Sequence, residues 1–349
     1  MRTVLVTGGC GFIGSHCVRS LLAQSGWRVV NVDKLTYAGH VENLPGVTEG
    51  PAYRFVKGDI VDSALVAEVF REERPWGVIN IAAESHVDRS ILDAAPFLQT
   101  NVIGAHVLLE AAATYGPERF LHISTDEVYG DTDKGLPSDE QSPLRPSSPY
   151  AASKAAADLL CLAFVRTRGL PVMIARSSNN FGPFQYPEKL IPVLCRNALR
   201  GETLPVYGDG LQRRDWLYVG DNVSALLAIL ERGRPGAVYN VSAGQERTNL
   251  EVARAVCRGL AARAGEAPQR LLDRIQLVPD RPGHDRRYAM DAGRIRDELD
   301  WRPRVTFDEG LRETLEWYVS HQEWIGKVLA VDYDTYYDAV YSRSWQRLP

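Results

Sequence analysis

The sequence predicts an α/β fold: a doubly wound parallel sheet covered by helices on both faces, with a smaller C-terminal substrate-binding lobe. Three observations support this prediction. Short β-branched runs alternate with segments of helical period, a glycine-rich turn follows the first run, and the composition changes after Ser177. Alternating strands and helices indicate parallel pairing, because each crossover needs a helix to return the chain.

The expected elements follow this alternation from the N-terminus. Strands are predicted at 3–7, 28–32, 53–56, 78–82, 120–124, 172–175 and 238–241. Helices are predicted at 12–24, 63–73, 97–115 and 151–167, where apolar residues recur with helical period. Six strands therefore precede Ser177, and the seventh comes from the second half of the chain.

Beyond Ser177 the sequence becomes rich in Gly, Pro and Arg. Such loops occupy 181–187, 207–215 and 280–287. Because long polar loops in a compact protein are usually functional, we expect residues 1–177 to form a nucleotide-binding domain and residues 178–349 a substrate-binding lobe. The segment at about 215–242 is expected to rejoin the sheet, through a helix at 221–231 and the strand at 238–241.

The tail after His321 contains Trp324, Tyr333, Tyr336 and Tyr337. A segment with so many aromatic residues is poorly suited to disorder, since burial of the rings offsets the entropy lost on ordering. We therefore expect the tail to pack on the body of the protein.

Composition excludes several classes of protein. The 349 residues carry 40 Lys and Arg against 44 Asp and Glu, and 45% are hydrophobic, as in ordinary globular proteins. The sequence contains no block of basic residues of the kind that binds nucleic acid, so no nucleic-acid partner is expected. The longest apolar stretches, such as 225–230, fall far short of the ~20 residues that a membrane helix needs, so no membrane association is expected.

Cysteine usage points to a reducing compartment. The odd count and the absence of a Cys-x-x-Cys pair favour free, buried thiols over disulfides. The five residues are Cys10, Cys17, Cys161, Cys195 and Cys257. Because the first apolar run begins at Thr3, there is no room for a signal peptide, and a cytoplasmic location is expected.

A nucleotide-binding signature follows the first strand. Gly8, Gly11 and Gly14 stand in a G-x-x-G-x-x-G pattern between a strand and a helix. Glycines there permit a tight turn, close approach of backbone N–H groups to a pyrophosphate, and close packing of the helix on the strand. The motif is weak alone, but its position at the start of a strand-helix-strand unit strengthens it.

Acidic residues end the next two strands. Asp33 lies about 20 residues after the turn, where a carboxylate holds the ribose 2′-hydroxyl of NAD and repels the 2′-phosphate of NADP. The neighbouring cation, Lys34, weakens that preference. Asp59 and Ile60 occupy the corresponding position after the third strand and are expected to contact the adenine edge.

Tyr150 and Lys154 form a Tyr-x-x-x-Lys pair at the start of a predicted helix. Residues four apart on a helix face the same side. A lysine cation beside the phenol is expected to lower the pKa of the tyrosine, making it a general base toward a substrate hydroxyl.

A pair of acids, Asp126 and Glu127, follows the strand at 120–124. The carboxyl ends of parallel strands are where such sheets bind ligands. Burial of one carboxyl beside another favours keeping one of them protonated, so the pair can supply one general acid and one general base.

Together these motifs resemble the extended short-chain dehydrogenase/reductase family, and within it the dTDP-glucose 4,6-dehydratases. The stretches that carry the resemblance are 33–39 (DKLTYAG), 82–90 (AAESHVDRS), 125–130 (TDEVYG), 178–183 (SNNFGP), 187–192 (PEKLIP) and 280–285 (DRPGHD). The resemblance extends to about Tyr318, and the tail beyond carries no motif of this family. The Asp-Glu pair is its specific element, because related 4-epimerases and decarboxylases usually lack it.

The resemblance implies a catalytic set. Tyr150 is the base at the sugar 4-hydroxyl, Lys154 is its electrostatic partner, and Thr125 donates a hydrogen bond to the same hydroxyl. Asp126 protonates the departing 6-hydroxyl, and Glu127 removes the C5 proton. The implied reaction is a hydro-lyase reaction of deoxysugar biosynthesis: oxidation at C4, loss of water across C5 and C6, and return of the hydride to C6.

The resemblance also implies the binding residues for a tightly bound NAD that is regenerated in each turnover. These are Gly8, Gly11, Phe12, Ile13, Gly14, Asp33, Lys34, Leu35, Thr36, Asp59, Ile60, Ala82, Ala83, Ser85, Thr100, Tyr150, Lys154 and Asn180.

For the nucleotide sugar, the implied contacts are Ser85, Thr125, Asp126, Glu127, Tyr150, Asn179, Lys189, Leu190, Pro205, Val206, Tyr207, Arg214, Asn249, Asp280, Arg281, Pro282, Gly283 and His284. Arg214 suits a diphosphate, because guanidinium groups bind phosphate oxygens in pairs; the alternative is a surface pair with Asp215. His86 and His284 are expected to have structural or substrate-positioning roles, and no metal site is expected.

Apolar residues on more than one face of 97–115 and 151–167 fit a homodimer seam of four helices, as in the resembled family. Two enzyme alternatives stay open: a UDP-sugar 4,6-dehydratase, and a 4-epimerase or decarboxylase on the same fold. The non-enzyme alternative is an NAD-binding regulator, which the intact set of Thr125, Tyr150 and Lys154 disfavours.

Overall fold

The computed structural model describes residues 1–329, 333 and 337. Its main sheet has seven strands in the order β10-β6-β5-β4-β1-β2-β3, and each neighbouring pair is parallel. The strands are β1 (Arg2–Thr7), β2 (Trp27–Asp33), β3 (Tyr53–Lys57), β4 (Gly77–Asn80), β5 (Arg119–Thr125), β6 (Val172–Ser177) and β10 (Val238–Val241). The doubly wound parallel sheet predicted from the sequence is confirmed.

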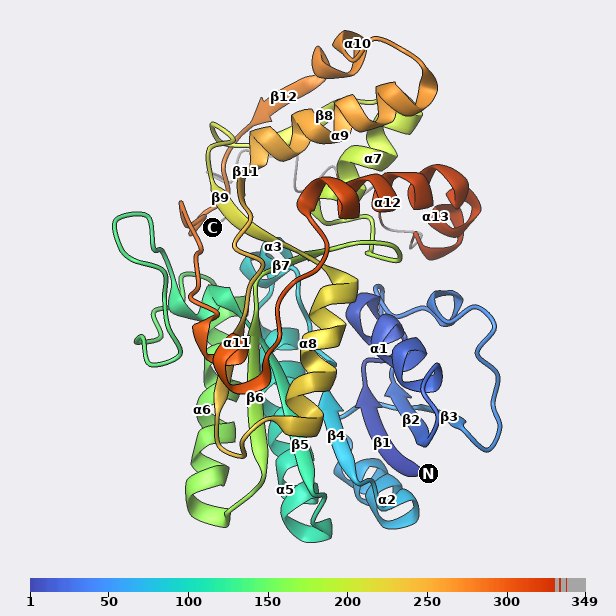
Figure 1. Cartoon of the computed structure of the whole chain (residues 1–349), viewed down its shortest axis with the longest axis vertical. Helices are drawn as coiled ribbons and strands as arrows, with labels where there is room; N and C mark the ends of the chain where they lie inside the picture. Colours follow the sequence, from blue (N-terminus) through green and yellow to red (C-terminus); the bar gives the residue numbers. More distant parts are fainter. Residues whose placement is uncertain (330–332, 334–336, 338–349) are drawn as a thin grey trace.

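Helices cover both faces of this sheet (Figure 1). One layer contains α2 (Ser63–Glu73), α5 (Ala105–Tyr115) and α6 (Pro149–Arg168), which pack side by side. The opposite layer contains α1 (Phe12–Leu22) and α8 (Val219–Arg232), with α11 (Gly293–Leu299) against α8. The layers enclose separate apolar clusters.

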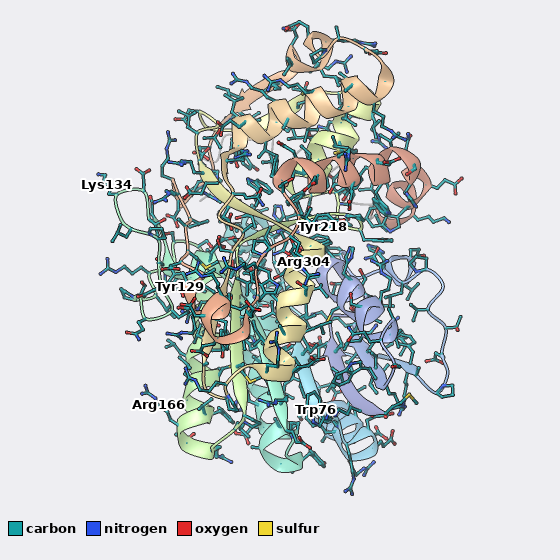
Figure 2. The ribbon with its side chains drawn as sticks, viewed as in Figure 1. Trp76, Tyr129, Lys134, Arg166, Tyr218 and Arg304 are labelled. Atoms are coloured by element: carbon teal, nitrogen blue, oxygen red, sulfur yellow. The ribbon has the colours of Figure 1, made fainter. Side chains whose placement is uncertain are left out.

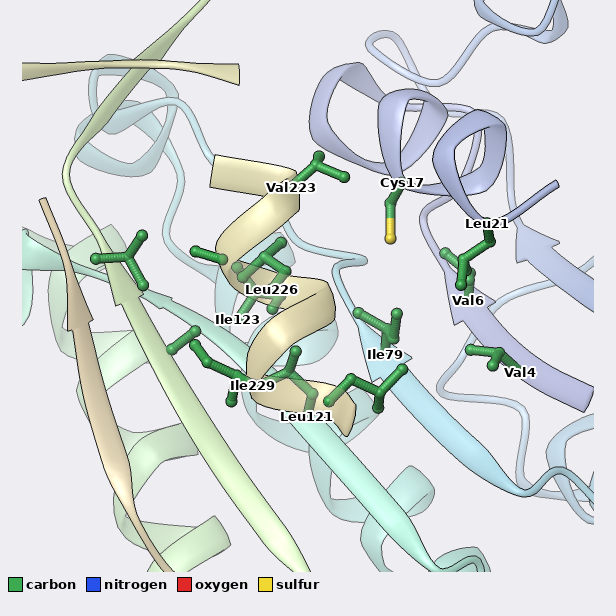
Figure 3. Packing of buried hydrophobic residues seen from close by; sticks show 14 of the residues in the cluster. Val4, Val6, Cys17, Leu21, Ile79, Leu121, Ile123, Val223, Leu226 and Ile229 are labelled. Carbon is green, nitrogen blue, oxygen red and sulfur yellow. The ribbon is translucent and has the colours of Figure 1, made fainter. Parts of the chain in front are cut away.

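Strand side chains alternate between these two clusters. Val4 and Val6 face α1 and α8, whereas Leu5, between them on β1, faces the other layer. This alternation follows from the two-residue repeat of a strand, and burial on both faces explains why the runs are continuously apolar. Figure 3 shows the apolar cluster between the sheet and the layer of α1 and α8, with Cys17 of α1 and Leu226 of α8 directed toward the strand side chains.

The structure differs from the sequence prediction within 97–115. A single helix was expected, but α4 (Ala95–Phe97) leads into a π-helical stretch, η2 (Leu98–Gly104), before α5 begins. The wider turn supports polar contacts at Thr100 and Asn101: the Thr100 hydroxyl accepts from Lys34, and the Asn101 amide bonds the Glu84 backbone. π-Helical turns often occur at functional sites.

The second half of the chain builds an upper lobe (Figure 1). Its helices are α7 (Leu190–Arg200), α9 (Asn249–Ala264), α10 (Gln269–Leu272), α12 (Phe307–Ser320) and α13 (Gln322–Val328). Two small sheets join it, β12-β8 and β11-β9-β7, formed by β7 (Asn179–Phe181), β8 (Leu204–Tyr207), β9 (Arg213–Tyr218), β11 (Glu246–Thr248) and β12 (Ile275–Val278). The lobe has its own apolar core.

The chain crosses between the lobes more than once. β9 pairs with β7 and β11, whereas α8 and β10 return to the main sheet. Figure 2 shows side chains crowded where the lobes meet, around Tyr218. The boundary placed after residue 177 stays a prediction.

The remaining short helices are α3 (Val87–Leu92), η1 (Val41–Asn43) and η3 (Asp126–Tyr129). The aromatic tail packs on the body as expected at Trp324, whose indole donates to Asn43 at 2.9 Å, and at the buried Tyr333; Tyr336 lies outside the described residues. All five cysteines are free and buried, as predicted. Within the described part of the chain, no helix is long and apolar enough to cross a membrane.

Candidate active site

The turn between β1 and α1 requires its glycines. Gly8 has a φ of +71°, and a Cβ there would lie 2.7 Å from the backbone of Ala82. A Cβ on Gly14 would lie 2.0 Å from the carbonyl oxygen of Gly8. Gly11 is the N-cap of α1 and supplies no capping side chain, so the helix presents its first backbone N–H groups to the cleft beside it. Such an N-terminus suits a pyrophosphate.

Asp33 ends β2 beside this turn. Its carboxylate accepts hydrogen bonds from the backbone N–H groups of Cys10 at 2.9 Å and Leu35 at 2.8 Å, while burial raises its pKa. Lys34 is turned toward other partners: its ammonium donates to Thr100 at 3.1 Å and lies 3.4 Å from the Asp59 carboxylate. The Lys34 ammonium is thus paired with Asp59, while the Asp33 carboxylate stays at the ribose position, an arrangement that favours ribose hydroxyls over a 2′-phosphate.

A cleft runs from the glycine turn along the carboxyl ends of β1, β2 and β4. Most of the predicted cofactor residues line it: Gly8, Gly11, Phe12, Ile13, Gly14, Asp33, Lys34, Thr36, Asp59, Ile60, Ala82, Ala83, Ser85 and Thr100. The side chain of Leu35 instead packs on the apolar core, and Asn180 lines a second cleft. Tyr150 and Lys154 are also outside the lining of the first cleft.

The groups that line the first cleft suit a bound dinucleotide. The glycine turn leaves room that a Cβ would fill, the N-terminus of α1 faces the cleft, and a carboxylate stands at the ribose position. Sequence reasoning missed Glu84, Tyr186 and Glu188, which also line the cleft. The stretches 82–90 and 187–192 contain Glu84 and Glu188, but no spacing rule assigned them a role.

The acid pair begins η3 at the end of β5. The Thr125 hydroxyl donates to the Asp126 carboxylate at 3.1 Å and accepts from the Glu127 backbone N–H at 3.3 Å. Both carboxyl groups have one buried oxygen without a hydrogen-bond partner among the described residues. These two oxygens are therefore available to a bound substrate.

Burial gives the two acids unusual proton affinity. It raises the pKa of Asp126 to about 7, with a further contribution from the negative charge of Glu127. Burial also raises the pKa of Glu127, but the cations Arg281, Arg214 and Lys189 oppose that increase. The environment thus favours a protonated Asp126, whereas three cations stabilise the ionised form of Glu127.

Tyr150 and Lys154 lie in the first turns of α6. Ser148 caps this helix by accepting from the Ala151 backbone N–H at 3.1 Å, and Pro149 occupies its first position. The Lys154 ammonium donates to the Ile123 carbonyl oxygen of β5 at 2.5 Å. The pair is therefore held between α6 and β5, next to the acid pair.

The expected effect of Lys154 on Tyr150 is wrong for this structure. Burial, followed by the negative charge of Glu127, raises the pKa of Tyr150 above its ordinary value. Burial likewise lowers the pKa of Lys154, to about 8. Desolvation and neighbouring carboxylates therefore determine the direction of the Tyr150 pKa shift in this structure.

A second cleft lies between the acid pair and the upper lobe. Several predicted substrate contacts line it: Glu127, Asn179, Lys189, Leu190, Pro205, Tyr207, Arg214, Asn249, Arg281 and His284. Lys189 lines both clefts, so the two adjoin. Ser85 lines only the first cleft, and Thr125, Asp126 and Tyr150 are buried outside the second cleft's lining.

Four further substrate predictions do not line this cleft. Val206 is fully buried in the upper core, because alternate residues of β8 point to opposite faces and its neighbours Pro205 and Tyr207 take the cleft side. The Asp280 carboxylate instead forms a hydrogen bond with Nδ1 of His284 at 2.6 Å. Pro282 and Gly283 are also absent from the lining; a Cβ on Gly283 would lie 2.6 Å from the Ser147 carbonyl oxygen.

Buried cations give the second cleft a positive wall. Arg214 does not take the surface pair with Asp215: its guanidinium donates to the Asp285 carbonyl oxygen at 2.9 Å, while Asp215 accepts from Ser178 and Ser242. Arg281 donates to Asp88 at 2.9 Å. Guanidinium groups held in this way suit a diphosphate.

Asp88 is a further residue that sequence reasoning left without a role. It accepts from Arg281 and from the Tyr207 hydroxyl at 2.9 Å, and so fixes two residues of the cleft. A single buried acid in a short helix gave no separate signal in the sequence. Among the described residues, no group of three or more His, Cys, Asp or Glu side chains is placed to hold a metal ion.

This chain is similar to known proteins over most of its length. A dTDP-glucose 4,6-dehydratase of Neisseria meningitidis is 49% identical over 348 residues, covering 95% of this chain and 98% of its own length. DesIV, a dTDP-glucose 4,6-dehydratase from Streptomyces venezuelae solved with NAD bound, has a TM-score of 0.88 at 45% identity and covers 93% of this chain and 99% of its own. A UDP-glucose 4-epimerase of Thermotoga maritima has a TM-score of 0.82 at 31% sequence identity, and the match covers 92% of this chain and 99% of that enzyme.

The parallel sheet, the glycine turn and the Tyr-x-x-x-Lys pair define an extended short-chain dehydrogenase/reductase. The family model described as GDP-mannose 4,6 dehydratase matches residues 5–314. With these relatives, the chain belongs to the dTDP-glucose 4,6-dehydratase family.

Proposed function

We propose that this chain is a hydro-lyase that converts dTDP-glucose to dTDP-4-keto-6-deoxyglucose with NAD, for deoxysugar biosynthesis. The observation that carries the proposal is the pair of the buried Asp126 and the half-buried Glu127 beside Tyr150, with Glu127 lining the second of the two adjoining clefts. The names of the relatives support the same substrate and reaction.

Oxidation at C4 is assigned to the residues of α6 and β5. Bound NAD supplies the hydride acceptor and, later in the cycle, the hydride donor. Tyr150 takes the proton of the sugar 4-hydroxyl, and the Thr125 hydroxyl holds that oxygen. Lys154, whose ammonium donates to the Ile123 carbonyl oxygen, is assigned to the nicotinamide ribose and to supplying positive charge. The glycine turn and Asp33 hold the rest of the dinucleotide.

Dehydration is assigned to the acid pair. The C4 ketone acidifies the C5 hydrogen, Glu127 removes it as a base, and Asp126 gives its proton to the departing 6-hydroxyl. The opposite environments of the two carboxyl groups suit these roles: Asp126 has a pKa raised to about 7, and Glu127 faces three cations. Arg214 and Arg281 are assigned to the diphosphate.

A 4-epimerase is the second candidate, favoured by the similarity to the Thermotoga maritima enzyme. Epimerisation needs C4 oxidation and reduction but no acid at C6 and no base at C5. Incubation with dTDP-glucose, with UDP-glucose in parallel, separates these functions by product mass. Loss of one water from dTDP-glucose supports the dehydratase, faster loss from UDP-glucose identifies a UDP-sugar dehydratase, and unchanged mass with both opposes dehydration.

We infer a homodimer in the cytoplasm as the working form. Three large apolar side chains are exposed on neighbouring helices: Leu159 of α6 at 59%, and Leu98 and Ile103 of η2 at 53% and 44%. Exposed apolar side chains on packed helices favour an interface with a second copy. Five free buried thiols support a reducing compartment.

A further inference from the structure

Two loops that line the dinucleotide cleft are joined by a side-chain hydrogen bond. The loop after β2 contributes Thr36, Ala38 and Gly39 to the lining, and the loop before α7 contributes Tyr186 and Glu188. Between them, the Tyr37 hydroxyl donates to Oε1 of Glu188 at 3.0 Å, across 151 residues of sequence. The two walls of the cleft are therefore tied to each other.

The carboxylate at this junction has a second partner. Arg89 of α3 donates from Nε to Oε2 of Glu188 at 3.0 Å, and its guanidinium lies 3.9 Å from the centre of the Tyr37 ring. The Glu188 side chain is only 1% exposed. A charge buried so completely depends on both partners, because removing either leaves it poorly compensated.

The loop before α7 is fixed on its other sides. The Lys189 ammonium donates to the Ser85 carbonyl oxygen at 2.7 Å, and the Tyr333 hydroxyl donates to the Pro187 carbonyl oxygen. The Tyr186 ring packs edge-on against Tyr37, with ring centres 5.4 Å apart. Since the loop before α7 is already anchored, the bond from Tyr37 to Glu188 ties the opposite loop to a fixed wall of the cleft.

We propose that Tyr37, Arg89 and Glu188 form a latch that holds the cleft closed over bound NAD and slows its release. The proposal rests on the proposed function, in which the hydride taken from C4 returns to C6 of the same sugar. Loss of reduced cofactor between these steps would strand an oxidised sugar. Opening the latch breaks the Tyr37 bond and exposes the buried Glu188 carboxylate, so the latch raises the barrier to NAD release.

Tyr37→Phe tests the latch, because it removes one hydroxyl and keeps the ring against Tyr186 and Arg89. Hydrogen bonds to charged groups have a net effect equivalent to about 10–100-fold in an equilibrium. We therefore expect NAD to leave the variant ~10–100-fold faster after dilution into NAD-free buffer. Activity of the diluted variant should decay and return when NAD is added, whereas the unchanged protein should keep its activity.

Tyr218→Phe is the matched control. Its hydroxyl also donates to a glutamate, Glu313, at 2.8 Å, but Tyr218 lines neither cleft. The control should release NAD at the rate of the unchanged protein. The latch is rejected if Tyr37→Phe also does so, or if both variants accelerate release equally.

A second variant keeps the proposal testable if Tyr37→Phe does not fold. Glu188→Gln preserves the size of the side chain and removes the ion pair with Arg89, and it should also accelerate release; a wild-type rate would overturn the latch. Release is measured on protein loaded with NAD and without sugar. A chain that fails to dehydrate dTDP-glucose therefore still tests the latch, and the two failures are distinguishable.

Discussion

Asp126 and Glu127 illustrate how position, more than residue type, assigns chemistry to a carboxyl group. They are adjacent in sequence, but Asp126 is buried, accepts a hydrogen bond from the Thr125 hydroxyl and is repelled by its neighbour, whereas the half-buried Glu127 interacts with cations from three other segments. Two carboxyl groups in different fields can act as acid and base in one active site.

Asp126→Asn should separate the steps of the reaction. The amide keeps size and hydrogen bonding but has no acidic proton to give, so loss of the 6-hydroxyl should slow by ~10²–10⁴-fold. C4 oxidation should continue, and NADH absorbance should accumulate when substrate is added. The variant should still exchange the C5 hydrogen with deuterated solvent, whereas the matched variant Glu127→Gln should not. Elimination by Asp126→Asn at the unchanged rate would remove Asp126 as the acid.

The pH dependence of elimination should report the same group. Asp126 must be protonated to donate, and burial raises its pKa to about 7, so the elimination rate should fall as pH rises through about 7. C4 oxidation uses Tyr150 as a base and should not fall in that direction. Rapid mixing with substrate, followed by NADH absorbance, gives both rates. An elimination rate that stayed constant through this range would contradict the assignment.

At the scale of elements, the junction of β1, its turn and α1 places the dinucleotide. Each element supplies one part: β1 ends at the cleft, the glycines permit close approach, and α1 presents its N-terminus. The strand-to-helix order and glycine spacing made this junction predictable from sequence.

Gly14→Ala should disrupt this junction. The new methyl group would lie 2.0 Å from the Gly8 carbonyl oxygen, so the turn must shift. We expect loss of bound NAD and a free energy of unfolding lower by ~1–3 kcal/mol, as for overpacking. Gly50→Ala is the control, because a Cβ there meets nothing within 4 Å. NAD content and thermal unfolding measure both effects; a Gly14→Ala protein with full NAD content would refute this account of the turn.

The elements that sequence did not predict have identifiable physical causes. Periodicity indicated a helix over 97–115 but not its π-helical part, because the local pattern does not record how Thr100 and Asn101 bond to distant groups. The raised pKa of Tyr150 depends on burial, which the Tyr-x-x-x-Lys spacing does not determine. Val206 faces the core because of its register on β8.

At the scale of the whole molecule, the active site lies where two lobes with separate apolar cores meet. The sheet and most of the cofactor cleft could be predicted, since they follow from local periodicity and glycine spacing. The contacts of Arg281 with Asp88 and of Tyr37 with Glu188 join segments 193 and 151 residues apart. Such pairs depend on how the lobes pack, which no local pattern specifies.

Leu159→Glu tests the proposed dimer. It places a charge among the exposed apolar side chains of α6 and η2, where a partner helix would have to desolvate it. The variant should be monomeric by light scattering after size-exclusion chromatography. Leu136→Glu is the control, since this leucine is 88% exposed on a loop outside these helices, and its mass should match the unchanged protein. Equal masses for both variants would oppose this interface.

The most direct test of the proposed dehydration uses dTDP-glucose carrying deuterium at C4. If the chain oxidises C4, eliminates water and returns the same hydride, the product will have lost one water and will carry the deuterium at C6. Mass spectrometry of the product, with NMR to place the label, reads both features in one reaction. A product that keeps its water, or that loses water while the deuterium stays at C4 or is released, would contradict the account.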